Sequence, residues 1–441
     1  MFDYELEQVK KKLDRLVREG RLQGKNIYLF GVSDNTRKII QVLRSYKLEP
    51  VYILDNDTAK QHGYCSRILV ISIEEVNNLQ NEKNLYIGYS QYWREMLNQL
   101  QEKKVKKENI LMLYKGETLW QNLGYAWRGK KVYEKLSEKY GNIPIFLCPY
   151  TGTGDIYLIG TFWKQYLKQE KINNYVFLVI NKACEKTAML FDIKNTEVLE
   201  QKIESTYLIQ YHMLCPEKAK IKILNDSWLK IHVDPLKWFR GFKGLNFKEL
   251  FRKFVFELPD TARPEAPVLK ETEELIEESF HKNDLQVGNT VVLSPYSNTL
   301  ADLPDVFWNR LVEELKKEGF SVCTNGNGDT EPALKGTSCV FVPLHRAPQW
   351  IEKAGYFIGV RSGFCDIISA SKAKKIILYD SRERFFNCSA YEYFNLKDME
   401  LCDDAVELLF DRDDRNLSEK IMNCITKWKE KAQIECNVCS G

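Results

Sequence analysis

The stretch NIPIFLCPYTGTGDIYLIGTFWKQYL (142–167) contains the pattern that decides the fold class. It begins with IPIFLCP, a short apolar run typical of a buried strand. The turn that follows contains Gly152 and Gly154, and Asp155 stands where a helix would open. A second apolar run, YVFLVIN (175–181), comes after that helix. Strand, turn, helix and strand in this order predict parallel strands joined by a covering helix.

The same plan recurs on both sides of this stretch. KNIYLFGVSDNTRKIIQVLRSYKLEPVYILDND (25–57) predicts a strand, a helix from Thr36 to Tyr46 and a second strand. NTVVLSPYSNT (289–299) opens a third unit, whose last strand is KKIILYD (374–380). We therefore expect an α/β protein built on three parallel sheets.

A chain of 441 residues is too long for one ordinary domain. We expect two facing Rossmann-like domains, which suit nucleotide binding between them, preceded by a small Rossmann-like N-terminal domain. The predicted parts are an N-terminal domain (1–118), a connector (119–141), a first facing domain (142–260), a proline-containing linker (261–288), a second facing domain (289–413), and a C-terminal helix and tail (414–441).

The composition and net charge of the chain indicate which partners and which compartment to expect. The formal net charge is only +3, so no global field favours nucleic acid, and we expect no nucleic-acid partner. The charged N-terminus predicts no signal peptide, and no apolar run approaches the roughly 20 residues of a membrane span. The 12 cysteines are scattered, which favours free thiols. These features predict a cytoplasmic protein, with the inner face of the cell membrane as the alternative site of work.

Two groups of residues could suggest metal binding, and we predict none. Cys436 and Cys439 form a lone CxxC without two further ligands at zinc spacing, and their role stays open. Asp55, Asn56 and Asp57 follow the second strand, where they could hold ribose hydroxyls or imitate an Asp-x-Asp metal motif. The dinucleotide fingerprint of this N-terminal unit is incomplete, which argues against tight pyrophosphate binding.

The loop after the strand at 142–149 is the first candidate site. Asp155 either caps the helix or acts as a general base that takes a proton from an acceptor hydroxyl. The residues before it have hydroxyls or no side chain, which suits a polar ligand that approaches the backbone closely. They are Tyr150, Thr151, Gly152, Thr153 and Gly154.

Four further polar loops fall at the carboxyl ends of successive strands in the third unit. Parallel strands bind nucleotides at this edge, although each loop alone could be a plain turn. The loops are SPYSNT (294–299) with Ser297, Asn298 and Thr299; TNGNGD (324–329) with Asn325 and Gly326; PLHRAP (343–348) with His345 and Arg346; and RSGFCD (361–366).

RSGFCD is the most telling of the four. Arg361 can grip phosphate oxygens with two N–H groups, Ser362 can donate or cap, and Gly363 permits close approach. The helix that follows favours negative charge at its start. Asp366 lies one turn into that helix, where it either binds a ligand hydroxyl or orients Arg361.

Several of these stretches resemble a known family. PYTGTGDIYLIGTFWKQYL (149–167) is similar to the opening of enzymes of the ADP-heptose lipopolysaccharide heptosyltransferase type, and AGYFIGVRSGFCDIISASKAKKIILYD (354–380) resembles their donor-diphosphate block. The resemblance covers roughly residues 142–400 and implies the glycosyltransferase-B fold. Residues 1–118 resemble small Rossmann-like modules attached to bacterial polysaccharide-biosynthesis enzymes.

The resemblance implies an inverting sugar transfer from a nucleotide-sugar to a carbohydrate or glycolipid acceptor, without metal or cofactor. Asp155 would be the catalytic base. The donor diphosphate would lie at Arg361, Ser362, Gly363, Ser297, Asn298 and Thr299, and its base, ribose and sugar near Asn325, Gly326, His345, Arg346 and Asp366.

The chain also departs from the family. The family's Asp-Ser-Gly is Arg361-Ser362-Gly363 here, and the lysine and histidine that the family carries nearby have no counterpart, so neither heptose nor ADP is implied. Three alternatives remain: a nucleotide-sugar 2-epimerase, a non-catalytic nucleotide-binding scaffold, and an NAD-dependent oxidoreductase using 25–57.

Overall fold

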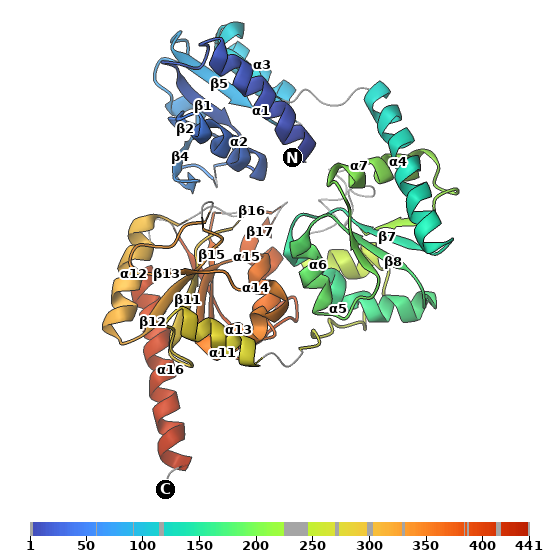
Figure 1. The fold of residues 1–441 in the computed structure, drawn as a ribbon. Helices are drawn as coiled ribbons and strands as arrows, with labels where there is room; N and C mark the ends of the chain where they lie inside the picture. Colours follow the sequence, from blue (N-terminus) through green and yellow to red (C-terminus); the bar gives the residue numbers. More distant parts are fainter. Residues whose placement is uncertain are drawn as a thin grey trace. The chain divides into compact units, whose positions relative to one another are not determined.

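The computed structural model describes residues 3–58, 60–90, 92–113, 119–224, 246–269, 273–297, 303–328, 331–382, 384–385, 388–411 and 416–439. Its strands form three sheets and a two-stranded ribbon, and the predicted α/β class with parallel sheets is confirmed (Figure 1). The chain divides into two compact units. The first comprises Met1–Pro149, Asn174–Asn181 and Glu197–Ile223, and the second Tyr150–Asn173, Lys182–Thr196 and Leu224–Gly441.

The first sheet of the first unit has the strand order β3-β4-β2-β1-β5-β6. Its strands are β1 (Asn26–Phe30), β2 (Tyr52–Leu54), β3 (Tyr64–Cys65), β4 (Ile68–Ile71), β5 (Asn84–Gly88) and β6 (Ile110–Met112). Only β3 and β4 pair antiparallel; the other registered pairs are parallel. The predicted strand, helix and strand at 25–57 are β1, α2 (Asp34–Ser45) and β2.

Helices cover both faces of this sheet, because its strands are buried on both sides. α1 (Asp3–Arg18) and α2 contribute Val9, Leu13 and Ile40 to one core. α3 (Trp93–Glu102) contributes Leu100 to the other. The short turns η1 (Ile73–Glu75) and η2 (Lys107–Asn109) complete this part.

The second sheet has the order β10-β7-β8-β9. Its strands are β7 (Ile145–Cys148), β8 (Val176–Val179), β9 (Thr196–Val198) and β10 (Ile221–Ile223), and β7 pairs in parallel with both β10 and β8. α4 (Leu119–Tyr140) and α7 (Ile203–Leu214) pack closely on each other. A methyl group on Gly129 would lie 1.9 Å from the Tyr207 carbonyl oxygen, so this helix crossing requires glycine.

The sheet of the second unit has the order β13-β12-β11-β14-β15-β18, and every neighbouring pair is parallel. Its strands are β11 (Thr290–Ser294), β12 (Ser321–Asn325), β13 (Ser338–Val340), β14 (Gly355–Val360), β15 (Lys374–Asp380) and β18 (Val406–Phe410). The chain runs outward from β11 to β13 and then from β14 to β18. This doubly wound order creates a crevice between the carboxyl ends of β11 and β14.

Helices on both faces bury this sheet. α12 (Asp305–Lys317) and α16 (Leu417–Cys439) share one core with it, through Trp308, Leu311 and Ile421. α11 (Glu273–Lys282) packs beside α13 (Ala347–Ala354), where the Phe280 and Trp350 ring centroids are 4.6 Å apart.

The remaining elements of the second unit are mostly short. They are α5 (Thr153–Glu170), α6 (Lys182–Met189), α10 (Phe247–Leu250), the wide turn η3 (Phe251–Val255), η4 (Leu344–Arg346), α14 (Gly363–Ile368), β16 (Arg384–Phe385), β17 (Cys388–Ser389) and α15 (Ala390–Phe394). Among the described residues no helix has the length and apolar character needed to cross a bilayer.

Candidate active site in the second unit

A pocket of about 450 Å³ lies at the carboxyl ends of β11, β12 and β14. Ser294 and Ser297 line it from β11 and its loop, and Ser362 and Gly363 from the loop after β14. These two loops flank the crevice that the strand order creates, which is where doubly wound sheets bind their ligands. The pocket therefore lies where the fold favours a nucleotide site.

Most of the residues predicted for the site line this one pocket. They are Gly152, Thr153, Gly154, Asp155, Ser297, Asn325, Gly326, Arg361, Ser362, Gly363 and Asp366. Tyr150, Thr151, His345 and Arg346 are not among the lining residues, and Asn298 and Thr299 fall outside the described residues. The ligand roles of all of these residues stay predictions.

The first turns of α5 and α14 meet at two glycines. A methyl group on Gly363 would lie 2.6 Å from the Gly154 nitrogen, and one on Gly154 would lie 2.6 Å from Asp366 Oδ2. Because backbone and a buried carboxylate stand at these positions, neither contact leaves room for a side chain. The glycines thus bring two helix starts, with their outward N–H groups, to the wall of one pocket.

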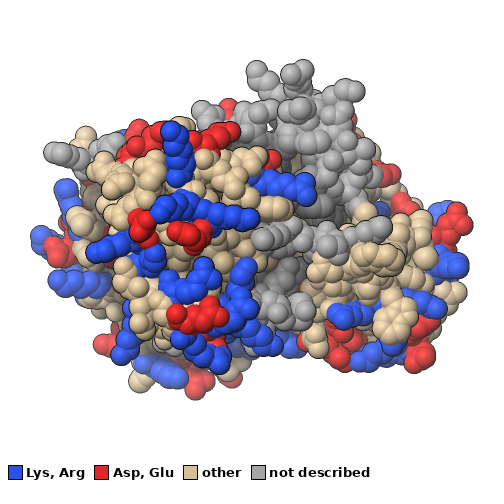
Figure 2. All heavy atoms as spheres, turned by 90° about the horizontal axis from the view of Figure 1, so that it is seen from above, with Lys and Arg blue, Asp and Glu red and all other residues tan. Residues whose placement is uncertain are grey.

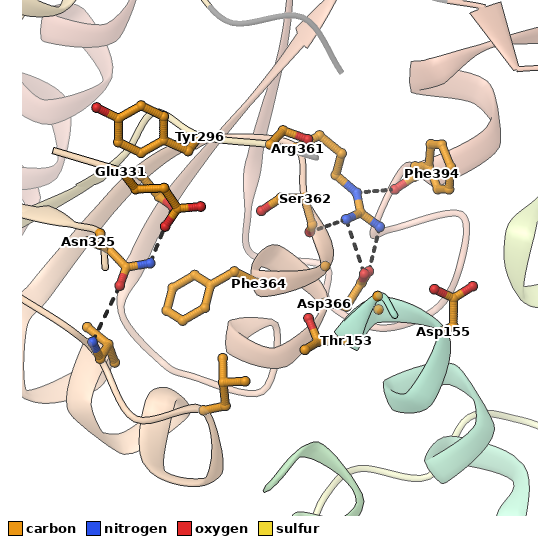
Figure 3. Close-up of a pocket in the computed structure, with 18 of the residues that line it drawn as sticks. Thr153, Asp155, Tyr296, Asn325, Glu331, Arg361, Ser362, Phe364, Asp366 and Phe394 are labelled. Carbon is orange, nitrogen blue, oxygen red and sulfur yellow. Dashed lines mark hydrogen bonds and ion pairs between the residues drawn. The ribbon is translucent and has the colours of Figure 1, made fainter. Parts of the chain in front are cut away.

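Asp155 lies in the first turn of α5 and is half-buried at the pocket wall. The helix begins at Thr153 with Gly152 as its N-cap, so Asp155 is the third residue of the helix and not its cap. A methyl group on Gly152 would lie 2.6 Å from Asp155 Oδ2, which shows that the carboxylate folds back over the start of the helix. Figure 3 shows this side chain on α5, near the Arg361–Asp366 pair.

Arg361 is engaged by other groups of the protein, and its predicted contact with phosphate stays a prediction. Its side chain is 4% exposed; Nη2 lies 2.5 Å from Asp366 Oδ1 and Nη1 lies 3.1 Å from Oδ2. Nε donates to the Phe394 carbonyl at 3.0 Å, and Nη1 also donates to the Ser362 carbonyl (Figure 3). Of the two roles considered for Asp366, the structure supports the one in which it orients Arg361.

The Arg361–Asp366 pair is buried at the edge of the pocket, and this burial changes the pKa of the carboxyl group. Burial raises the pKa of the Asp366 carboxyl above its ordinary value, and the Arg361 guanidinium opposes that rise. A bidentate pair out of water is rigid, and it holds the loop after β14 against α14. Arg361 therefore shapes the pocket by fixing the loop that contains Ser362 and Gly363.

On the β12 side the polar groups form a loose chain. Asn325 Nδ2 lies 3.4 Å from Ser294 Oγ, and Asn325 Oδ1 accepts from the Val342 N–H at 3.4 Å (Figure 3). The Tyr296 hydroxyl donates to the Pro332 carbonyl at 2.6 Å. A methyl group on Gly326 would lie 2.3 Å from the Glu331 carbonyl oxygen, which explains glycine there.

Several lining residues were not named individually from the sequence, although Ser294, Tyr296, Leu344 and Phe364 lie in predicted loops. They are Phe247, Ser294, Tyr296, Glu331, Phe341, Val342, Leu344, Phe364, Tyr393 and Phe394. Phe341 directly follows β13 and is 61% exposed, so its ring is available to a planar ligand. A polar or aromatic residue directly after a strand was the signal available for Phe341, and YEYF (391–394) was an unused aromatic cluster.

The charged residues in the described lining are mainly acidic. Asp155, Glu331 and Asp366 face one cation, Arg361, which is already paired. An anionic ligand would thus depend on the N–H groups at the starts of α5 and α14 and on hydroxyl donors. The described part of the chain holds no cluster of three His, Cys, Asp or Glu side chains suited to a metal ion.

His345 and Arg346 belong to η4, the turn that contributes Leu344 to the pocket. Both are half-buried, and His345 Nδ1 and Arg346 Nε have no hydrogen-bond partner among the described residues. Burial, with Arg346 and Lys186 nearby, lowers the pKa of His345. Neutral imidazole is thus favoured at this position.

Asp55, which was considered above for binding ribose or a metal, binds backbone N–H groups of the first unit. Its carboxylate accepts from the Val32 N–H at 2.7 Å and from the Asp57 N–H at 2.9 Å. Lys60 Nζ lies 4.0 Å from the same carboxylate. Asp55 therefore stabilises the loop after β1.

No protein-family model matches the sequence, and no curated protein matches it. Among solved structures, ADP-heptose LPS heptosyltransferase II of E. coli aligns with 65% of this chain and 100% of its own, at 13% identity and a TM-score of 0.45. E. coli heptosyltransferase WaaC with ADP-2-deoxy-2-fluoro heptose aligns with 65% and 99%, at 8% identity and a TM-score of 0.38. A glycosyl transferase family 9 protein from Veillonella parvula aligns with 63% and 89%, at 11% identity and a TM-score of 0.40.

Proposed function

We propose that this protein is a glycosyltransferase of the glycosyltransferase-B type, which moves a sugar from a nucleotide-sugar to an acceptor hydroxyl with inversion and without a metal. One observation carries the proposal. Asp155, a carboxylate at the start of α5, lines the same pocket as the loops that flank the crevice between β11 and β14. A base and a nucleotide-binding crevice in one pocket are what a direct sugar transfer requires.

Asp155 would act as the general base. Its carboxylate takes the proton of the acceptor hydroxyl as that oxygen forms a bond to the anomeric carbon. The bond from this carbon to the diphosphate oxygen breaks at the opposite face, and its electron pair leaves with the nucleoside diphosphate. One displacement inverts the anomeric centre. The acceptor class we propose is a carbohydrate or glycolipid, met in the cytoplasm.

The leaving diphosphate would be stabilised by N–H groups that are already in place. Ser362 and Gly363 begin α14, and the Arg361–Asp366 pair fixes the loop before it. Donors that need no rearrangement stabilise developing charge most effectively. In this account Arg361 is a positioning residue for the diphosphate loop, and Phe341 and Asn325 lie on the side of the nucleoside.

The test is a pair of matched substitutions. Asp155→Asn keeps the side-chain shape but removes the base, so transfer should fall roughly 10²–10⁴-fold while donor affinity stays within about threefold. Asp305→Asn, a carboxylate in the first turn of α12 outside the pocket lining, should leave both unchanged. Transfer is measured with each nucleotide-sugar that raises the melting temperature.

Two outcomes would contradict the proposal. Normal turnover by Asp155→Asn would remove Asp155 from the chemistry. An altered sugar formed from the donor alone, with no acceptor present, would assign the pocket to a nucleotide-sugar 2-epimerase.

A further inference from the structure

The outward face of α4 exposes large apolar side chains. Trp120 is 80% exposed, Trp127 is 60% exposed and Leu123 is 41% exposed. Spacings of three, four and seven residues place all three on one stripe of the helix. The opposite face, with Ala126 and Leu136, is buried.

Such a stripe is costly to leave in water. Tryptophan is a highly buried residue on average, and two of them two turns apart on one helix, with Leu123 between, make a continuous apolar surface. Within the described part of the first unit, α4 packs on α7 through its other side, at Gly129 and Tyr207, and not through this stripe. The stripe therefore suits a surface outside the unit.

The charged residues of α4 indicate what kind of surface the apolar stripe contacts. The helix contains five basic residues and two acidic ones, and Lys135 and Lys139 pair with Glu200 and Glu197 outside it, so the excess positive charge lies at 128–131. Lys131 extends the apolar stripe, and its ammonium lies 3.7 Å from the centre of the Trp127 ring. Lys130 is exposed next to it and pairs with Glu134 at 3.5 Å. Tryptophan followed by lysine, on one face of a helix, is the chemistry of a bilayer interface with anionic headgroups.

We propose that α4 is a membrane-contacting helix, which seats Trp120, Leu123 and Trp127 among the headgroups of a bilayer that contains anionic lipid. The indole rings have an apolar body and an N–H donor, which suits the boundary between acyl chains and water. A second copy of this helix is the competing occupant, and the flotation experiment distinguishes it from a bilayer. This assignment does not depend on the proposed chemistry, since it needs neither donor nor acceptor.

Vesicle flotation tests the assignment on the full chain. Wild type should float with vesicles of 70% phosphatidylcholine and 30% phosphatidylglycerol, and less with phosphatidylcholine alone or in 0.5 M salt. Trp120→Ala with Trp127→Ala should weaken binding roughly tenfold or more, since two large apolar groups are lost. Replacing both by Phe should retain most of it.

Two further variants separate membrane contact from general effects. Lys131→Glu should weaken binding to the anionic vesicles about fivefold while leaving the melting temperature unchanged. Tyr92→Ala removes an aromatic ring that is 59% exposed elsewhere in the unit, and it should float like wild type.

Three results would overturn the proposal. The first is no flotation of the wild type with either vesicle. The second is equal flotation of the double alanine variant. The third is a wild-type dimer, seen by light scattering, that the double alanine variant converts to monomer without any vesicle binding in either protein, because the stripe would then join two copies.

Discussion

The first sheet and the sheet of the second unit share a doubly wound order, but different side chains stand at their crevices. In both, the crevice lies where the strand order reverses, between β1 and β5 in one and between β11 and β14 in the other. At β11 and β14 small and polar residues leave a space of about 450 Å³. At the ends of β1 and β5 the neighbouring side chains are two methionines, Met96 and Met112.

The methionines lie against the glycines at those strand ends. A methyl group on Gly31 would be 3.0 Å from Met96 Cε, and one on Gly88 would be 2.7 Å from Met112 Sδ. Asp55 also engages the Val32 N–H, a group that a phosphate would need. Strand order thus provides a crevice in both sheets, and the side chains at the strand ends differ: methionines in the first, small and polar residues in the second.

The buried pair at the open crevice should give the largest effect on stability. Arg361→Met leaves the Asp366 carboxylate buried without its partner, which should lower the free energy of unfolding by about 3–5 kcal/mol. Chemical denaturation measures the loss. Arg310→Met removes an exposed pair with Glu314, at 2.8 Å in α12, and should cost about 0.5 kcal/mol or less. Equal costs would show that the pair does not hold the loop after β14.

A cavity beside the end of β5 in the first sheet should lower the stability of the protein. Met112 is 5% exposed, so Met112→Ala should cost about 2–4 kcal/mol, while nucleotide binding by the chain stays unchanged. Met213→Ala, at a site 53% exposed, should stay within about 0.5 kcal/mol of wild type. Loss of nucleotide binding in Met112→Ala would place a ligand at the first sheet as well.

Strand-end loops were the part of the site that sequence could predict. Short apolar runs mark β7, β11, β12 and β14, and the polar residues after them line the pocket as parallel topology requires. The contact of Gly154 with Gly363 was not predictable, because the two glycines come from helices far apart in the sequence.

Other features depended on side-chain volume in space. The methionines at Gly31 and Gly88 carry no local signal, since methionine fills gaps of any shape. The start of α5 also differs from the prediction. The helix begins two residues before Asp155, because Gly152 is its N-cap residue. The strand β18 (Val406–Phe410) escaped prediction because it is short and contains Glu407, which faces the Tyr379 hydroxyl at 2.5 Å.

A smaller effect should come from His345, at the turn beside the pocket. Its pKa is lowered in the folded protein, so the unfolded chain binds a proton first as the pH falls below about 6.5. Stability should therefore drop between pH 7 and pH 5, and His345→Gln should reduce that drop by a degree or two in melting temperature. An unchanged pH slope would show that His345 titrates alike in both states.

The most direct test of the account is a calorimetric titration of the full chain with nucleotide-sugars. We predict one site per chain, which Gly363→Val abolishes, since a larger side chain would strike the Gly154 nitrogen, 2.6 Å from the first added atom. Gly88→Val, at the end of β5 in the first sheet, should keep that site in protein that remains folded. Two sites per chain, or binding lost in Gly88→Val and kept in Gly363→Val, would contradict the assignment of the ligand to the crevice between β11 and β14.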